Sequence, residues 1–288
     1  MTKQVTTIKE VRDYRWREPS KTWGLVPTMG FLHEGHLSLV RRALQDNDSV
    51  GVSIFVNPAQ FNDVSDLENY PSNLSNDLQL LEKEGVDLVW TPTPEIVYPK
   101  DYQTYVDVGR LTHALEGRSR PGHFRGVTTV VSKLFNVFQP NRAYFGQKDA
   151  QQAVVVEKMV QDLNFNLDII VGATVRESDG LAMSSRNANL TPDNRKNAVC
   201  LYRALMSARN LFNAGERDSG KLRENMTHIL DAEKTARIDY VSVAHTETLE
   251  ELERIEDSAL ISLAVFMGEV RLIDNVIVSA HLPSPNAF

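Results

Sequence analysis

The stretch from Leu25 to Leu44 reads LVPTMGFLHEGHLSLVRRAL, and it places a strand, a turn and a helix in direct succession. Its apolar run ends at Pro27, and a turn that contains Gly30 and Gly35 follows. Beyond the turn, apolar side chains recur with the spacing of one helix face, at Leu37, Val40, Ala43 and Leu44. This order predicts a strand, loop and helix unit of an α/β protein.

His33 and His36 stand where this predicted helix begins. The first amides of a helix lack internal partners and lie at the positive end of its dipole, so they bind anions. A histidine at such a place is most often a cap or a polar surface residue. The sequence His-x-Gly-His between a strand and a helix is nevertheless typical of nucleotidyl-transferring enzymes with a Rossmann-like sheet. We therefore predict a nucleotide phosphate site here, with Gly35 allowing close approach to the backbone.

The composition is that of a soluble globular protein. The chain has 288 residues, enough for two domains. A net charge of −7 argues against nonspecific nucleic-acid binding, which needs a basic surface. The single cysteine, Cys200, fits a reducing compartment and is predicted to be a buried apolar residue. The start of the chain lacks the pattern of a signal peptide, and the apolar run 259–267 is too short to span a bilayer. We therefore expect a cytoplasmic protein with no nucleic-acid or membrane partner.

Two regions differ in their pattern of elements. Through about residue 175, predicted strands at 22–26, 50–56, 86–90, 143–145 and 167–171 alternate with helical segments, which predicts parallel strands with crossover helices. After Arg176 the pattern changes to helices at 191–214 and 219–236, followed by strands at 238–244, 260–266 and 270–278. We predict a Rossmann-like α/β domain over 1–176 and a smaller α+β domain over 177–288. The acidic stretch 247–257 is expected to be a solvated helix face or a loop.

Other candidate site residues follow predicted strands or lie in long loops. Lys148 follows a strand and a glycine turn, where a lysine can reach a phosphate. A polar loop carries Ser184, Ser185 and Arg186, which are suited to a transferring phosphoryl group. The loops 57–71 and 92–124 are long enough to be functional or covering segments. These loops contain Asn57, Gln60, Arg120 and His123. Two glutamines, Gln151 and Gln152, lie at the start of the helix after Lys148. Taken singly, each of these residues is more simply a surface or loop residue.

Taken in order, these motifs resemble the pantothenate synthetase family, whose members are also called pantoate–β-alanine ligases. The resemblance covers nearly the whole chain. It is carried by Pro27-Thr28-Met29-Gly30, His33-Glu34-Gly35-His36, Phe55-Val56-Asn57-Pro58-Ala59-Gln60-Phe61, Arg120-Pro121-Gly122-His123-Phe124, Gly146-Gln147-Lys148-Asp149-Ala150-Gln151-Gln152, Val175-Arg176-Glu177, Met183-Ser184-Ser185-Arg186 and Arg271-Leu272-Ile273-Asp274-Asn275.

The resemblance implies a two-step ligation. The carboxylate of (R)-pantoate attacks the α-phosphate of ATP to give pantoyl adenylate and pyrophosphate, and the amine of β-alanine then displaces AMP to form pantothenate. It also implies Mg²⁺ bound with ATP, and a homodimer. Because the adenylate is easily hydrolysed, we expect the second domain to act as a lid that excludes water.

The resemblance also assigns residues. His36 matches the family's proton donor, and the expected catalytic residues are His33, His36, Lys148, Ser184, Ser185 and Arg186. The expected pantoate and β-alanine residues are Asn57, Gln60, Arg120 and Gln152, and no protein metal ligand is expected. The expected ATP site comprises Met29, Gly30, Phe31, Leu32, His33, Glu34, Gly35, His36, Gly146, Gln147, Lys148, Asp149, Val175, Met183, Ser184, Ser185 and Arg186.

The chain departs from the family pattern at three positions. Gln147 replaces a frequent glutamate, Ser72 replaces a usual arginine, and Asn76 precedes Asp77 where an acidic pair can occur. Two alternatives share the histidine motif. One is a nucleotidyltransferase of the phosphopantetheine adenylyltransferase type, which would not need the pair Gln60 and Gln152. The other is a nucleotide-binding module without catalysis, which would need fewer converging donors.

Overall fold

The computed structural model describes residues 1–280, and these form two compact units. The first comprises residues 1–112, 120–146 and 152–172 and is called the parallel-sheet unit below. The second comprises residues 113–119, 147–151 and 173–280 and is called the antiparallel-sheet unit. Two short segments, 113–119 and 147–151, thus belong to the second unit although the chain around them belongs to the first. The expected boundary near residue 176 stays a prediction.

The parallel-sheet unit is built on six parallel strands in the order β1-β4-β3-β2-β5-β6. The order reverses at β2, because the chain adds β3 and β4 on one side and β5 and β6 on the other. In such sheets, ligands bind beyond the carboxyl ends of the strands at the reversal. That point is the end of β2 and of its neighbour β5. The strands are β1 (Lys3–Val5), β2 (Trp23–Thr28), β3 (Ser49–Ile54), β4 (Leu88–Trp90), β5 (Arg142–Gly146) and β6 (Asp168–Gly172).

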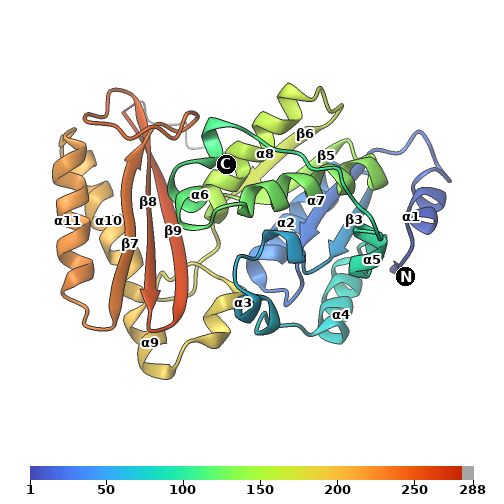
Figure 1. The fold of residues 1–288 in the computed structure, drawn as a ribbon, viewed down its shortest axis with the longest axis horizontal. Coiled ribbons are helices and arrows are strands. Elements are labelled where there is room, and N and C mark those ends of the chain that lie inside the picture. The colour runs from blue at the N-terminus through green and yellow to red at the C-terminus, as the bar shows by residue number, and fades with distance from the viewer. Residues whose placement is uncertain (281–288) are drawn as a thin grey trace. The chain divides into compact units, whose positions relative to one another are not determined.

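Helices cover both faces of this sheet (Figure 1). Alternate residues of a strand point to opposite faces, and the two apolar clusters follow this alternation. Val26 and Tyr144 pack in a cluster with α2 (Glu34–Asp46) and α4 (Leu74–Glu84). Leu25 and Phe145 pack in a cluster with α1 (Ile8–Arg15), α7 (His123–Phe138) and α8 (Ala150–Asp162). The predicted Rossmann-like arrangement is confirmed.

The two long loops of this region contain short helices. The first loop has a 3-10 turn, η1 (Pro58–Gln60), and the helix α3 (Val64–Glu68). The second has α5 (Pro94–Val97), η2 (Arg110–Thr112) and α6 (Leu115–Ser119) before α7 begins. Asn57 caps η1 by accepting a hydrogen bond from the Ala59 N–H.

The antiparallel-sheet unit consists of β7 (Ala236–Ala244), β8 (Ser258–Met267) and β9 (Val270–Ser279), paired in that order, with helices α9 (Pro192–Asn197), α10 (Val199–Asn213) and α11 (Ser219–Asp231). The apolar faces of α10 and α11 share one core with the sheet. Cys200 is buried in this core, as predicted, and burial raises the pKa of its thiol to about 11. The predicted smaller α+β region is confirmed.

Several predicted elements need correction. The helix expected over 219–236 ends at Asp231, because Ala236 already pairs with Met267 in the sheet. The helix expected over 191–214 is divided into α9 and α10. The acidic stretch 247–257 is a loop, which agrees with the expectation of a helix face or a loop. The patterns did not predict β1 or α1, since a strand of three residues is too short to show a period and gains its stability from pairing with β4.

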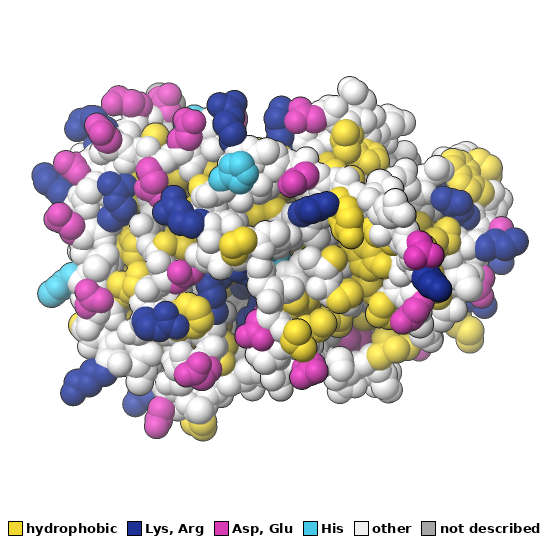
Figure 2. Space-filling view, in the orientation of Figure 1, with side chains coloured by type: hydrophobic (Ala, Val, Ile, Leu, Met, Phe, Trp, Pro, Cys, Tyr) yellow, Lys and Arg dark blue, Asp and Glu magenta, His cyan; other side chains and the backbone are white. Residues whose placement is uncertain are grey.

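Charged side chains of both signs are mixed on the face drawn in Figure 2 rather than gathered by sign. Within residues 1–280, no helix combines the length and the apolar character needed to cross a membrane.

Candidate active site

The two histidines cap the start of α2 with their own rings. The Gly35 N–H donates to His33 Nδ1 at 3.2 Å, and the His33 N–H donates to His36 Nδ1 at 3.3 Å. The rings lie against each other, with centroids 4.1 Å apart. Because each Nδ1 accepts a hydrogen bond, the hydrogen of each neutral ring resides on Nε2. Both rings therefore present an N–H donor at the positive end of the helix.

A buried carboxylate shapes the loop that leads to these histidines. Asp77, on α4, is 1% exposed, and its oxygens accept hydrogen bonds from Phe31 N–H and Leu32 N–H, both at 2.8 Å. Phe31 has a φ of +52° and Gly30 a φ of +85°, conformations that L side chains rarely adopt. A Cβ on Gly30 would also lie 3.1 Å from the Asp77 carboxylate. Asp77 therefore stabilises the turn between β2 and α2.

The side chain of Glu34 is engaged at the surface of α2. Its carboxylate forms an ion pair with Arg41 on the same helix, and Arg41 also pairs with Glu84 at 2.6 Å. Hydrogen bonds from Glu84 and Glu34 raise the pKa of Arg41. We infer that Glu34 contributes its backbone, and not its carboxylate, to the candidate site.

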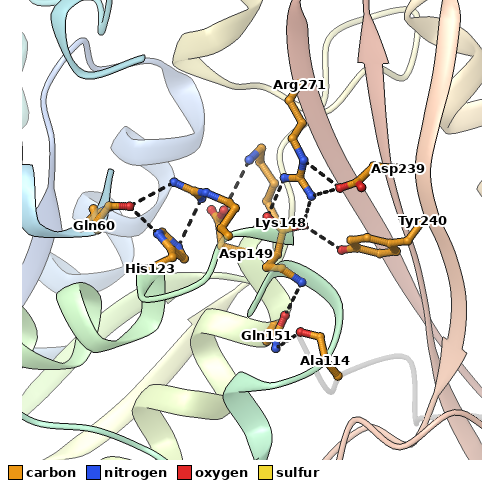
Figure 3. A network of polar contacts seen from close by, with 11 residues as sticks. Gln60, Ala114, His123, Lys148, Asp149, Gln151, Asp239, Tyr240 and Arg271 are labelled. Atoms are coloured by element: carbon orange, nitrogen blue, oxygen red, sulfur yellow. Dashed lines mark hydrogen bonds and ion pairs between the residues drawn. The ribbon is translucent and has the colours of Figure 1, made fainter. Parts of the chain in front are cut away.

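A second polar group in the same unit surrounds Gln60. Its side-chain Oε1 accepts from Asn57 Nδ2 at 3.0 Å, and its Nε2 lies 3.3 Å from the sulfur of Met29. Its main-chain oxygen accepts from Arg120 Nη2 at 3.3 Å and lies 2.8 Å from His123 Nδ1 (Figure 3). The contact with Met29 connects Gln60, a predicted substrate residue, to the loop 29–36 that carries the two histidines.

Lys148, in the antiparallel-sheet unit, lies on a turn that β9 holds. The turn is η3 (Gln147–Asp149), and Lys148 Nζ is 3.6 Å from the Asp149 carboxylate. Asn275 Nδ2 donates to the main-chain oxygens of Gln147 and Lys148, both at 2.9 Å, and Asn275 Oδ1 accepts from Gln147 Nε2 at 3.1 Å. The side-chain amide of Gln147 thus acts as a donor to Asn275.

Asp274, which precedes Asn275 in β9, anchors the loop that carries Ser184, Ser185 and Arg186. Asp274 is 1% exposed and receives two hydrogen bonds from Arg176, at 2.6 and 3.0 Å. Burial raises the pKa of Asp274, while the Arg176 guanidinium acts in the opposite direction. Arg176 pairs with Ala182, and Ser184 caps η4 (Ser185–Asn189) by accepting from the Arg186 N–H at 3.3 Å. Two adjacent residues of one strand therefore position both Lys148 and the loop.

The segment 113–119 is anchored within the same unit by a buried ionic cluster (Figure 3). Arg271 donates to both oxygens of Glu116, at 2.7 and 2.8 Å, and to Asp239 at 2.6 Å, while Tyr240 donates to Glu116 at 3.0 Å. Burial disfavours the charged form of Arg271, but its carboxylate partners outweigh this and raise its pKa. Gln151 joins the cluster by bonding the backbone of Glu116 and Ala114, each at 2.9 Å.

The structure divides the predicted residues between the units. The parallel-sheet unit holds the loop 29–36, Asn57, Gln60, Arg120, Gly146 and Gln152, and the antiparallel-sheet unit holds 147–149, Val175 and 183–186. Sequence patterns indicated no role for Asp77, Asp274 or Asn275. Asp274 and Asn275 form part of a motif noted above, whereas Asp77 resembles an ordinary helix residue.

The structure contains no group of three or more His, Cys, Asp or Glu side chains able to hold a metal ion, as far as residues 1–280 are concerned. The Asp77 carboxylate accepts hydrogen bonds from the backbone N–H groups of Phe31 and Leu32.

The sequence profile of the Pantoate-beta-alanine ligase family matches residues 3–277. The chain belongs to this family. It is 53% identical to a pantothenate synthetase of Thermotoga neapolitana over 95% of this chain and 99% of that one, and 55% identical to that of Acetivibrio thermocellus over 88% and 91%. Among solved structures, a pantothenate synthetase of Thermus thermophilus is similar with a TM-score of 0.91 and 45% identity, over 96% and 99% of the two chains.

A further member of the family has been solved with ligands. The pantoate-beta-alanine ligase of Francisella tularensis, complexed with beta-gamma ATP and beta-alanine, is similar with a TM-score of 0.80 and 35% identity. The similarity covers 96% of this chain and 97% of that one.

Proposed function

We propose that this protein is an ATP-dependent ligase that condenses (R)-pantoate with β-alanine to give pantothenate, AMP and pyrophosphate. Family membership over residues 3–277 supports the reaction. The observation that carries the mechanism is the pair of imidazoles at the start of α2, whose Nε2–H groups and helix amides suit the phosphates of ATP.

In the first step, a carboxylate oxygen of pantoate attacks the α-phosphorus of ATP, and the bond from that phosphorus to the bridging oxygen of pyrophosphate breaks. Negative charge grows on the leaving pyrophosphate, so donors that meet it lower the barrier. We assign this role to His33, His36, Lys148 and the group Ser184, Ser185 and Arg186, with the remaining ATP contacts from residues 29–36, 146–149, Val175 and Met183.

In the second step, the amine of β-alanine attacks the acyl carbon of the pantoyl adenylate, and the bond to the phosphate oxygen breaks to release AMP. The adenylate is needed because a free carboxylate would have to expel oxide. Water competes with the amine for the adenylate, so the antiparallel-sheet unit is assigned the role of a lid that closes on the nucleotide.

Neutral hydrogen-bond donors suit the pantoate site, since they hold the pantoate carboxylate without neutralising the charge that makes it a nucleophile. Gln60 and Gln152 are such groups. Asn57 donates to Gln60 and to the Gly126 oxygen, so it supports the side chain of Gln60, and Arg120 contacts the backbone of Gln60. Mg²⁺ would enter with ATP as part of the substrate, where it would offset the negative charge of the phosphates. The homodimer and the cytoplasmic location stay predictions.

Exchange of labelled pyrophosphate into ATP tests this function. The ligase exchanges pyrophosphate when pantoate is present and β-alanine is absent. A phosphopantetheine adenylyltransferase ignores pantoate, and a binding module shows no exchange with either acceptor. Absence of pantoate-dependent exchange by the folded protein would refute the proposed mechanism.

A further inference from the structure

Tyr98 is connected to Gln60, a predicted pantoate residue, by a chain of side-chain hydrogen bonds. Its Oη donates to Asn57 Oδ1 at 2.7 Å, and Asn57 Nδ2 donates to Gln60 Oε1 at 3.0 Å. Tyr98 follows α5, whereas Asn57 precedes η1 and Gln60 ends it, so the chain joins two loops that are far apart in sequence. All three residues belong to the parallel-sheet unit.

This chain determines which end of the Gln60 amide is presented to a ligand. Its oxygen is bound to Asn57, so its nitrogen lies at the other end, near Met29. A carboxylate only accepts hydrogen bonds, so it needs the nitrogen; the reverse orientation would present an oxygen and repel it. The sulfur of Met29 is a weak acceptor and competes little with a carboxylate.

The backbone of Gln60 is fixed independently of Tyr98. Its main-chain oxygen contacts His123 and Arg120, as Figure 3 shows for His123. The turn η1 also lies close to α7, where a Cβ on Gly126 would be 2.2 Å from the main-chain oxygen of Ala59. What remains for Tyr98 to influence is the side-chain amide.

Asn57 transmits the effect because its amide is buried and fully used. The residue is 1% exposed, and its nitrogen also donates to the Gly126 oxygen at 3.1 Å. Besides the hydroxyl of Tyr98, its oxygen receives a longer contact from the Ala59 N–H at 3.4 Å. Without the hydroxyl, this buried acceptor loses its short hydrogen bond, so the orientation of the Asn57 amide, and with it that of Gln60, is less strongly fixed.

The surroundings of Tyr98 hold its ring in place and keep its hydroxyl a donor. The ring packs edge-on against Tyr102, with centroids 5.2 Å apart, and lies 6.4 Å from the ring of Phe55. Burial raises the pKa of Tyr98, so the hydroxyl keeps its proton at neutral pH.

We propose that Tyr98 is a positioning residue for the organic acid substrate, acting through Asn57 on the orientation of the Gln60 amide. The proposal rests on the function proposed above and deepens it, because it assigns Tyr98 to recognition of the carboxylate substrate and not to recognition of ATP.

Tyr98→Phe removes the hydroxyl and keeps the ring. Calorimetric titration with pantoate is expected to show affinity weakened about tenfold, equal to about 1.4 kcal/mol, while ATP affinity stays within about twofold. In the exchange assay the KM for pantoate rises by a similar factor and the KM for ATP does not. Tyr102→Phe is the matched control, since it removes a hydroxyl from the adjacent ring and leaves the chain to Asn57 intact.

A second comparison places Tyr98→Phe in a Gln60→Ala background, where it is expected to leave pantoate affinity unchanged. Unchanged affinity in the single variant, equal weakening for both substrates, or an effect that persists without Gln60 would overturn the proposal. Calorimetry measures binding and needs no turnover. A wild-type protein that binds pantoate but does not exchange pyrophosphate would refute the proposed function. The variants would still test the role of Tyr98 in that case. A wild-type protein that binds no pantoate overturns both.

Discussion

Asp77→Asn tests whether the histidine loop is held in shape by one buried carboxylate. The asparagine has nearly the same volume but retains a single acceptor, and its amide nitrogen faces a backbone N–H. One of the two bonds, to Phe31 or to Leu32, is lost and the other loses its charge. Hydrogen bonds to charged groups contribute about 1.5–3 kcal/mol each, so the turn loses about 2 kcal/mol or more.

This loss is comparable to the cost of the turn itself. A left-handed residue such as Phe31 costs about 1–2 kcal/mol, which the bonds to Asp77 offset. Without them the loop populates other conformations, and the apparent affinity falls by the fraction that remains competent. A loss of about 2 kcal/mol corresponds to ATP binding weakened about 30-fold.

The sign of the change separates this explanation from simple electrostatics. Removing a negative charge close to bound phosphates would by itself strengthen ATP binding, whereas loss of the loop geometry weakens it. Titration calorimetry with ATP measures the change, and Glu82→Gln is the control, because it removes an exposed carboxylate from the same helix. ATP affinity equal to or tighter than that of the wild type in folded Asp77→Asn protein would refute the assigned role.

Three further substitutions test separate parts of the account. His36→Ala is expected to lower pantoate-dependent exchange about a hundredfold or more without changing the circular dichroism spectrum, and near-normal exchange would remove His36 from its role. Gly126→Ala is expected to lower the free energy of unfolding by about 1–3 kcal/mol and to raise the KM for pantoate, because the new Cβ would clash with the backbone of η1. Alanine alone favours a helix, so a stabilised protein would show that α7 and η1 do not need to approach closely. Asn275→Ala removes the hydrogen bonds to Gln147 and Lys148. It is expected to lower the free energy of unfolding in urea by about 2–3 kcal/mol and to slow pyrophosphate exchange. Unchanged exchange would mean that Asn275 does not position Lys148.

The fold was predictable where apolar periodicity is strong. Leu37, Val40 and Ala43 show the period of α2, and all three are buried against the sheet. Periodicity failed where pairing with a distant segment decides the structure, as at β1 and at the start of β7, since neither partner is near in sequence. Both regions depend on tertiary contacts that outweigh local preference.

Motifs pointed to the residues proposed to touch ligands, but not to those that hold them in place. His33 and His36 were recognisable because their spacing around Gly35 is rare. Asp77 and Tyr98 were not, because a single carboxylate on a helix or a tyrosine before a proline has no pattern that reveals a buried hydrogen bond. Their roles follow from geometry that the chain acquires only on folding.

The central claim is that the carboxylate of pantoate attacks the α-phosphorus of ATP. Pantoate that carries a heavy oxygen isotope in its carboxylate tests this directly, through mass analysis of the nucleotide and pyrophosphate after complete turnover with β-alanine. The account predicts one labelled oxygen in AMP and none in pyrophosphate, because the attacking oxygen leaves with the nucleotide. Unlabelled AMP, or label in a phosphate that does not derive from the α-position, would contradict it.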